Sequence, residues 1–485
     1  MPHEFLSDFL SRLQDAGELV RISAPVDSGL EVAAITDRIS KTPAGGPALF
    51  FEKPRNSSIP IVTNLLGSQR RLLLALGVDA LSQVTEKMGR LLQSDGGTWL
   101  EAFGLAPSWS GLSKFAPRTI KTAVCQQVVK LGRDVNVWEL PVPRCWPEEI
   151  NPVLTCCQVL TRSPSNQTSF ERFPVQVIGQ QQLVPHWNRY HSGYQFWQQA
   201  IREQKQLPIA LALGGDPLQT LATAAPLVRP QDALLFAGFL RGAAIDVIKA
   251  RSVDLDVPAA SEIVLEGYID FAAPLADASS VASSSGHYLP GEPLPVIQVT
   301  AITHRANPVL PAIIPGAPPC EESLIGLAVR HLSLPLAQGL VPELVDLHQP
   351  VAGAGRNILF ASLRKQHPGQ ARQALHAIWG SRLLGLYKLI VIVDDDIDVH
   401  NEQQVWFAVG SNVNPAQDVI ADDGPIMMDD LTSLSRGMGR KMGIDATRKL
   451  PEENHGKPAA RRLVVPPELA NQIEQRWQEY GLGGY

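Results

Sequence analysis

The spacing of hydrophobic positions changes along the chain, and each change predicts a different kind of element. Near the N-terminus, Phe5, Phe9 and Leu13 recur about one helical turn apart among polar residues. This spacing predicts an amphipathic helix over residues 3–16. We expect a first α/β domain over residues 1–115. It would also contain short strands, because apolar runs bounded by turn residues follow: 19–22, 47–52 and 60–64.

The middle of the chain, residues 116–310, consists of short segments rich in valine and isoleucine, separated by glycine, proline and serine. This pattern predicts an antiparallel sheet or split β-barrel with few helices. The predicted strands are 155–161, 173–178, 233–239, 245–249, 262–266 and 296–303. The serine-rich segment 278–286 is low in complexity and is typical of a flexible loop.

Helical patterns return after a proline-rich segment, residues 311–322, which we interpret as a linker. A helical pattern over 371–384 precedes a buried strand over 389–393. This order predicts a second α/β domain over residues 323–430. The fold class is therefore mixed α/β.

The C-terminal tail, residues 431–485, ends in a polar helix over 466–483 with one apolar stripe. The stripe could pack on its own domain or on a partner subunit, and the sequence favours neither.

Composition and charge exclude several function classes. The 485 residues are 45% hydrophobic and 19% charged, so the chain can bury sizeable cores. The net charge is -6 without a long basic run, which does not favour nucleic-acid binding. Apolar runs are too short to span a bilayer, so we do not expect a membrane-embedded protein. The five cysteines form no CxxC pair, which favours the reducing cytoplasm.

Several motifs together resemble the UbiD family of decarboxylases, in that family's order, over about residues 3–480. The motifs are ALFFEKPRN and IPIVTNLLGSQRR within 48–71, PIALALGGDP at 208–217, FAGFLRG at 236–242, DLDVPAASEIVLEGYI at 254–269, VDDDIDV at 393–399 and GRKMGIDATRKLP at 439–451.

The resemblance implies an N-terminal α/β domain, a split β-barrel that holds the cofactor, and a C-terminal α/β domain with an oligomerising helix. It implies prenylated FMN with a divalent, manganese-type metal, and self-association into dimers or hexamers. The implied reaction is non-oxidative decarboxylation of an aromatic or α,β-unsaturated acid. One branch of the family acts on prenylated 4-hydroxybenzoate in quinone biosynthesis.

The family positions an arginine between two acids, and this sequence has replaced all three. The arginine motif, N-x-G-x-Y-R, falls on residues 169–174, so Pro174 stands at the arginine position. The motif of the acids falls on residues 278–283, where Ala278 and Ser283 stand. Proline has no side-chain donor, and a serine hydroxyl does not deliver a proton near neutral pH without an activating partner.

Two neighbouring residues are weak substitutes for these groups. Arg172 precedes Pro174 by two residues, so on a strand it shares the same face about 7 Å away. For Arg172 and Glu171 we favour a solvated surface pair. Asp277 is one residue from the first acid position and could supply a proton if its loop shifts.

The predicted metal site is half present. Glu262, in SEIVLEG, matches the family's metal-binding glutamate, although an ion pair with Lys249 or Arg251 would also explain it. Ser169 stands at the position of the ligating asparagine and Tyr190 at that of the histidine.

Other positions would approach the cofactor if it binds. The candidates are His186, Trp187, His191, Arg241 and Arg372. Pro318 and Pro319 retain part of a motif close to G-R-P-P, but Ala317 replaces an arginine that would carry positive charge towards the cleft.

Two hypotheses from different classes follow. One is a carboxy-lyase with altered chemistry acting on a small aromatic acid. The other is a non-catalytic homologue that binds or scaffolds, for instance beside a paralogous decarboxylase, or carries a flavin. We favour lost or altered catalysis. A cleft lined by Glu262 and Arg241 would support flavin binding, whereas filling by Phe173, Pro174 or the loop 277–290 would argue against it.

Overall fold

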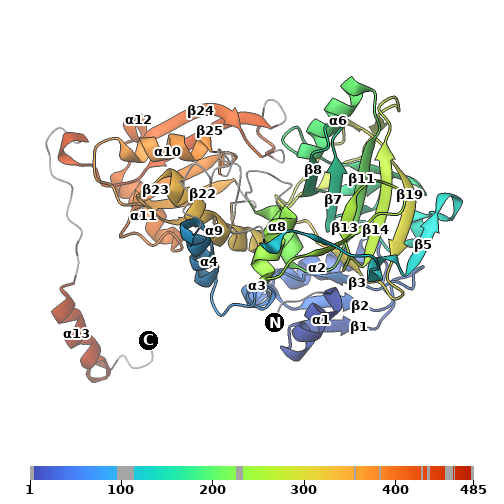
Figure 1. Ribbon diagram of the computed structural model, residues 1–485. Helices are drawn as coiled ribbons and strands as arrows, with labels where there is room; N and C mark the ends of the chain where they lie inside the picture. The colour runs from blue at the N-terminus through green and yellow to red at the C-terminus, as the bar shows by residue number, and fades with distance from the viewer. Residues whose placement is uncertain are drawn as a thin grey trace.

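The computed structural model describes residues 5–94, 114–225, 233–353, 357–381, 384–427, 430–433, 437–453, 463 and 465–481. The chain forms an N-terminal part, drawn in blue, a curled central sheet in green and yellow, and a C-terminal part in orange (Figure 1). None of the described helices is both long and apolar enough to cross a membrane.

The N-terminal part is built on a four-stranded sheet with the order β1-β2-β3-β20. Its elements are α1 (Leu6–Asp15), β1 (Leu19–Ile22), α2 (Glu31–Ser40), β2 (Ala48–Phe51), β3 (Ile61–Thr63), α3 (Gln69–Leu76), α4 (Ser82–Ser94) and β20 (Leu310–Ala312). The predicted first helix and first strand are confirmed, with Phe9 and Leu13 fully buried. Strand β20 pairs parallel to β3 although it follows the whole central sheet in the chain.

The central part is a nine-stranded sheet whose neighbouring strands are antiparallel throughout. The strands are β5 (Val128–Leu131), β6 (Val153–Leu154), β7 (Cys157–Arg162), β8 (Thr168–Arg172), β9 (Val175–Val177), β10 (Gln182–Pro185), β11 (Leu207–Leu213), β14 (Ile263–Ile269) and β19 (Ile297–His304). The sheet curls into a half-barrel around an apolar core (Figure 1). Helix α6 (Ser192–Glu203) packs on this sheet.

Smaller ladders flank the half-barrel. They comprise β4 (Arg118–Thr119) with β12 (Asp246–Lys249) and β13 (Asp256–Pro258), β15 (Ala276–Asp277) with β18 (Pro293–Leu294), and β16 (Val281–Ala282) with β17 (Tyr288–Leu289). The serine-rich segment predicted as a loop therefore contains a short strand.

One predicted strand is wrong. Residues 233–239 belong to a helix, α8 (Ala233–Arg241), which packs beside α7 (Leu218–Ala224). The helix is apolar nearly all round and mostly buried, so it has no polar face to mark a helical period. A short apolar run of this kind cannot be told from a buried strand by periodicity alone.

The C-terminal part is a five-stranded sheet with the order β21-β22-β23-β25-β24. Its strands are β21 (Leu344–His348), β22 (Ile358–Leu363), β23 (Leu389–Asp394), β24 (Val419–Pro425) and β25 (Met438–Asp445). Its helices are α9 (Glu321–Leu340), α10 (Gln370–Gly380), α11 (Glu402–Asn412) and α12 (Pro415–Asp418). The predicted helix and strand over residues 371–393 are confirmed, although the helix ends earlier than expected.

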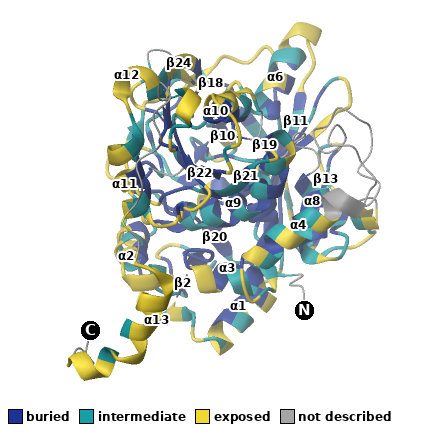
Figure 2. Cartoon of the chain, turned by 90° about the vertical axis from the view of Figure 1, so that its left-hand side faces the viewer, coloured by how far each residue is buried: buried dark blue, intermediate teal, exposed yellow. Residues whose placement is uncertain are grey.

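The tail helix α13 (Pro467–Gln475) stands away from the rest of the chain (Figure 1). None of its residues is buried, and Figure 2 colours almost the whole helix as exposed. Its apolar stripe therefore does not pack on its own domain in this structure.

Candidate functional site

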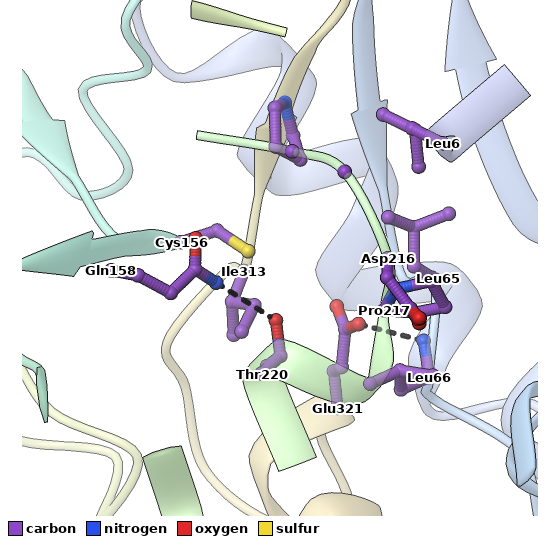
Figure 3. A pocket seen from close by; sticks show the side chains of 13 residues that line it. Leu6, Leu65, Leu66, Cys156, Gln158, Asp216, Pro217, Thr220, Ile313 and Glu321 are labelled. Atoms are coloured by element: carbon purple, nitrogen blue, oxygen red, sulfur yellow. Dashed lines mark hydrogen bonds between the residues drawn. The ribbon is translucent and has the colours of Figure 1, made fainter. Parts of the chain in front are cut away.

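A small cavity lies where the three parts of the chain meet (Figure 3). The N-terminal part contributes α1 and the turn after β3, the half-barrel contributes β7 and the turn after β11, and the first turn of α9 closes it. Its polar lining side chains are Gln158, Asp216, Thr220 and Glu321, and leucines, prolines and Ile313 form the apolar remainder. The cavity volume is about 20 Å³, which is room for one water molecule and not for a flavin.

The polar side chains in this cavity are deeply buried and incompletely hydrogen-bonded. Gln158 Nε2 donates to Thr220 Oγ1 at 3.2 Å, and Glu321 Oε1 accepts from the Leu66 amide at 2.7 Å (Figure 3). Gln158 Oε1, Asp216 Oδ2 and Glu321 Oε2 receive no hydrogen bond from the described residues. Buried polar atoms normally have partners, so ordered water or a small polar group belongs here.

Two of these groups are acids whose pKa values are raised close to neutral pH. Burial raises the pKa of Glu321 to about 7 and the pKa of Asp216 to about 7. An acid with such a pKa can give or take a proton at neutral pH. Cys156 lines the same cavity, and burial raises its pKa to about 12, so it stays a neutral thiol.

Arg172, a predicted substitute for the missing arginine, lies close to this cavity. It ends β8, and its Nη2 lies 2.7 Å from Glu322 Oε1 in an ion pair that is largely buried. Burial opposes its charge, but the Glu322 carboxylate holds the pKa of Arg172 above its usual value.

The interpretation of Arg172 and Glu171 as a solvated surface pair is wrong. Glu171 is buried, and its carboxylate accepts from the Ser192 and Gly193 amides at 2.9 and 3.0 Å. It therefore caps the N-terminus of α6, where an acid complements the free amides and the helix dipole.

The structure does not bring Asp277 to Arg172 and Glu321. Asp277 is exposed and belongs to β15, where it pairs with Pro293. The positions predicted to have lost the family's acids lie beside it. Ala278 is buried in the half-barrel core, and Ser283 is buried in the hairpin of β16 and β17.

The predicted cofactor-binding residues lie in three separate places. Trp187 and His191 pack against the Phe173 ring inside the half-barrel, with ring centroids 5.8 and 5.1 Å away. The backbone amide of neighbouring His186 donates to Pro174 O at 2.9 Å.

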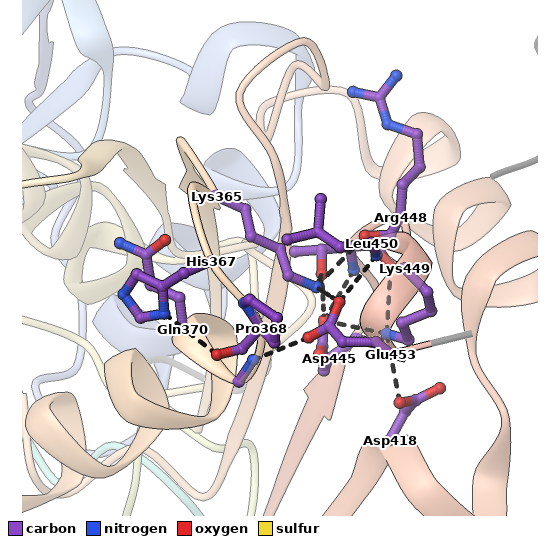
Figure 4. A network of polar contacts seen from close by, with 12 residues as sticks. Lys365, His367, Pro368, Gln370, Asp418, Asp445, Arg448, Lys449, Leu450 and Glu453 are labelled. Carbon is purple, nitrogen blue, oxygen red and sulfur yellow. Dashed lines mark hydrogen bonds and ion pairs between the residues drawn. The ribbon is translucent and has the colours of Figure 1, made fainter. Parts of the chain in front are cut away.

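Arg241, at the end of α8, lies 4.0 Å from Asp216 Oδ2. Arg372 lies on α10 in the C-terminal part and donates to Gln417 O at 2.8 Å. It lines a separate cavity beside a polar network that joins Lys365, Asp418, Asp445, Lys449 and Glu453 (Figure 4).

Glu262, the predicted metal ligand, is fully engaged within the chain. One carboxylate oxygen lies 2.8 Å from Arg305 Nη1, and the other accepts from the Val309 amide at 3.1 Å. The pairing with a basic residue was expected as the alternative, but the partner is Arg305. Burial raises the pKa of Glu262, and Arg305 opposes that shift.

Comparison with known proteins decides the family. Family models described as the N-terminal, Rift-related and C-terminal domains of 3-octaprenyl-4-hydroxybenzoate carboxy-lyase (UbiD) match residues 10–91, 118–318 and 323–446. A protein of Aquifex aeolicus is 36% identical over 479 residues, 98% of each chain. The chain belongs to the UbiD family. The mixed α/β fold with its half-barrel, predicted from the sequence, is therefore confirmed.

Solved UbiD-class structures cover nearly the whole chain. HmfF from Pelotomaculum thermopropionicum, in complex with FMN, has a TM-score of 0.78 and 26% identity, covering 96% of this chain and 98% of its own. An evolved dimeric form of HmfF was solved with prFMN. The closed form of vanillic acid decarboxylase from Sedimentibacter hydroxybenzoicus has a TM-score of 0.87 and 26% identity over 99% of both chains.

The residues at the expected UbiD metal positions do not fit a divalent metal. Ser169 Oγ lies 2.5 Å from Thr161 Oγ1, the Tyr190 hydroxyl donates to Gly437 O at 2.6 Å, and both oxygens of Glu262 accept hydrogen bonds within the chain. Among the described residues, no group of three or more His, Cys, Asp or Glu could hold a metal ion.

The described part of the half-barrel interior does not fit a flavin either. Next to Pro174, the position predicted for the UbiD arginine, the Phe173 ring packs beside Trp187, and Ala278 joins the same core. Gln176 fastens the loop after Asp277 to β9, because it bonds both the amide and the hydroxyl of Ser279. In the part of the chain that the structure describes, side chains and a tethered loop occupy this interior.

Reasoning from the sequence did not single out Glu321, Glu322 or Asp216. Glu321 and Glu322 open a helix, where acids are common for reasons of dipole alone. Asp216 closes a glycine turn after β11, which is also ordinary. The available signal was a pair of adjacent acids at the start of a long apolar helix. Such a pair indicates that one of the two carboxylates faces the protein interior.

Proposed function

We propose that this UbiD-family protein has lost the prenylated-FMN-dependent decarboxylation of its relatives and acts as a binding or scaffolding homologue. The observation that carries the proposal is the filled half-barrel. Phe173 and Ala278 belong to the apolar core, and the half-buried Pro174 stands where the resemblance expects an arginine. A proline and an alanine can neither orient a carboxylate nor deliver a proton.

The state of the expected metal ligands supports the same proposal. A catalytic metal needs ligands that are free to donate lone pairs. Ser169, Tyr190 and Glu262 each use their oxygens in hydrogen bonds or ion pairs within the chain. A metal at Glu262 would compete with Arg305 for the same carboxylate, which the ion pair already neutralises.

The test is reconstitution. The chain is co-expressed with a prenyl-flavin synthase and purified, and its absorbance spectrum and released small molecules are measured. The vanillic acid decarboxylase of Sedimentibacter hydroxybenzoicus, prepared in parallel, is the positive control. We expect a folded protein without bound flavin and without carbon dioxide release from aromatic acids. Stoichiometric prenylated FMN together with carbon dioxide release would overturn the proposal.

A second candidate function has one observation in its favour. Arg172 and Glu322 form a buried pair beside Glu321, an acid with a pKa of about 7, so an arginine and two acids do meet. These are the group types that UbiD decarboxylation uses. If carbon dioxide release is detected, Glu321→Gln should abolish it and Asp277→Asn should not. The reverse result would favour Asp277 as the proton donor.

A scaffolding role needs a partner surface, and the tail helix supplies a candidate. The side chains of Leu469, Ile473 and Trp477 form one stripe on and just beyond α13, and none of them is buried. We expect this stripe to contact a second copy of the chain or a paralogous decarboxylase. Light scattering on the full chain and on a truncation ending at residue 462 tests it, because equal masses would contradict a role in self-association.

A further inference from the structure

A second cleft, separate from the Glu321 cavity, lies between α2, the β16–β17 hairpin and the segment 315–319. Its volume is about 150 Å³, the size of an apolar cavity known to take a benzene ring. The lining comprises three aromatic rings, several small residues and one ion pair: Asp37, Lys41, Trp146, Ala282, Ser283, Gly286, His287, Tyr288, Gly316 and Ala317.

The walls of this cleft are held in place by contacts outside it. Trp146 Nε1 donates to Pro315 O at 2.6 Å, which fixes the plane of the indole. A Cβ atom on Gly316 would lie 2.8 Å from Asp37 Oδ1 and 3.3 Å from the indole, so only glycine leaves this space open. A Cβ atom on Gly286, whose φ is +81°, would likewise lie too close to Ala317. The result is a narrow space beside aromatic walls.

Lys41, the lysine among the described lining residues, is already saturated. The Lys41 ammonium donates to Asp37 Oδ1 at 2.8 Å, to Ala317 O at 2.6 Å and to Pro319 O at 2.8 Å. An ammonium has three N–H groups, so none remains for a ligand. Its charge is also neutralised by Asp37. A carboxylate entering the cleft would therefore lose water without gaining a charged partner, which is costly.

The cleft also contains two of the substituted positions. Ser283 stands where the resemblance expects an acid, and Ala317 where it expects an arginine. The negative and the positive group are thus lost from the same space. The charged side chains that remain in the lining, Asp37 and Lys41, are paired with each other.

Two polar groups of the cleft remain able to bind a neutral ligand. His287 Nδ1 lies 3.0 Å from Ser285 O, which can only accept, so Nδ1 carries the proton and Nε2 of the neutral ring is an acceptor. The Tyr288 oxygen accepts from the Glu148 amide at 3.3 Å, and its own O–H stays available as a donor. Each is a chemically suitable partner for a ligand hydroxyl, which can donate to Nε2 and can accept from the Tyr288 O–H.

We propose that this cleft binds a neutral phenol with a single ring and discriminates against the corresponding benzoate. The aromatic lining and the volume favour binding of a single ring. Because the Lys41 ammonium has no N–H left to donate, binding of a carboxylate is disfavoured. The inference rests on the proposed binding function and names its ligand class.

The test is calorimetric titration of the full chain with phenol, benzoate and cyclohexanol at about pH 8, where imidazoles are largely neutral. We expect phenol to bind at least tenfold more tightly than either of the others. Ala317→Leu should fill the cleft and abolish phenol binding. Ala273→Leu, on an exposed loop, is the matched control and should leave binding unchanged.

Two results would overturn the proposal: benzoate binding as tightly as phenol, or phenol binding that persists in Ala317→Leu. Circular dichroism of both variants guards against misfolding, and Ser283→Glu, which places a charge in the cleft, gives a second disruption. The outcome is independent of the flavin experiment. Retained prenylated FMN would contradict the proposed loss of catalysis. A flavin-free protein that does not bind phenol would contradict only the proposed ligand class.

Discussion

The guanidinium of Arg172 lies 2.7 Å from a carboxylate oxygen of Glu322, 150 positions later in the chain. The pair joins the end of β8 to the first turn of α9, and both side chains are largely buried. It thereby couples the half-barrel to the helix that opens the C-terminal part.

Breaking this pair should be strongly destabilising. Glu322→Gln leaves the Arg172 charge buried without its partner, and we expect the free energy of unfolding to fall by about 3–5 kcal/mol. Chemical denaturation measures this. Replacing both residues, in Arg172→Met with Glu322→Leu, should recover most of the loss. Asp254→Asn, in an exposed pair with Arg162, is the control and should change far less. If Glu322→Gln and Asp254→Asn lowered the free energy of unfolding equally, the stabilising role of the Arg172–Glu322 pair would be contradicted.

Glu321 should make the protein less stable as pH rises. Its pKa is about 7 in the folded chain and near 4.3 when unfolded, so the folded state holds more protons between these values. Its contribution to stability is therefore lost between about pH 4.3 and pH 7. We expect Glu321→Gln to match the native chain near pH 5 and to exceed its stability at pH 8 by up to about 3 kcal/mol. Glu474→Gln, on exposed α13, should show no such trend.

His331 and His348 should make the protein less stable as pH falls, which is opposite to the trend expected for Glu321. Burial lowers the pKa of His331 and of His348 to about 4. The Arg330 and His400 charges deepen both shifts. The unfolded chain takes up these protons near pH 6.5, so stability falls as pH drops from about 6.5 to 4. We expect His348→Gln to reduce the fall in melting temperature between about pH 6.5 and 4, and exposed His367→Gln to leave that fall unchanged. An identical fall in His348→Gln would exclude this role.

Glu262 should not support metal binding. Because Arg305 and the Val309 amide occupy its oxygens, titration of the chain with Mn²⁺ should show no site that depends on Glu262. The native chain and Glu262→Gln should give the same calorimetric trace. Tight binding by the native chain that disappears in the variant would instead establish the metal site expected from the UbiD resemblance.

Local pattern was enough for much of the fold. Leu19–Ile22 is a strand within the predicted bounds, and most of the runs rich in valine and isoleucine in the middle segment form the half-barrel. The pattern failed at Ala233–Arg241, since a helix buried on all sides loses the polar face that reveals its period.

The candidate site depended on contacts that no local pattern contains. Motif spacing alone was enough to predict substitutions at Pro174, Ala278 and Ser283. The burial of Arg172 was not, because its partner, Glu322, comes from a helix far along the chain. The same applies to Glu262, whose carboxylate is engaged by a residue beyond the end of β19.

The return of β20 to the first sheet has a consequence for the order in which this protein can mature on the ribosome. The N-terminal sheet lacks an edge strand until residues 310–312 have been synthesised, long after β3 ends at Thr63. Until then β3 presents unpaired backbone groups along one side, which is a template for unwanted pairing. Translation of the entire half-barrel must therefore precede completion of the domain that was made first. A nascent fragment ending near residue 115 should need chaperone protection that the finished chain does not.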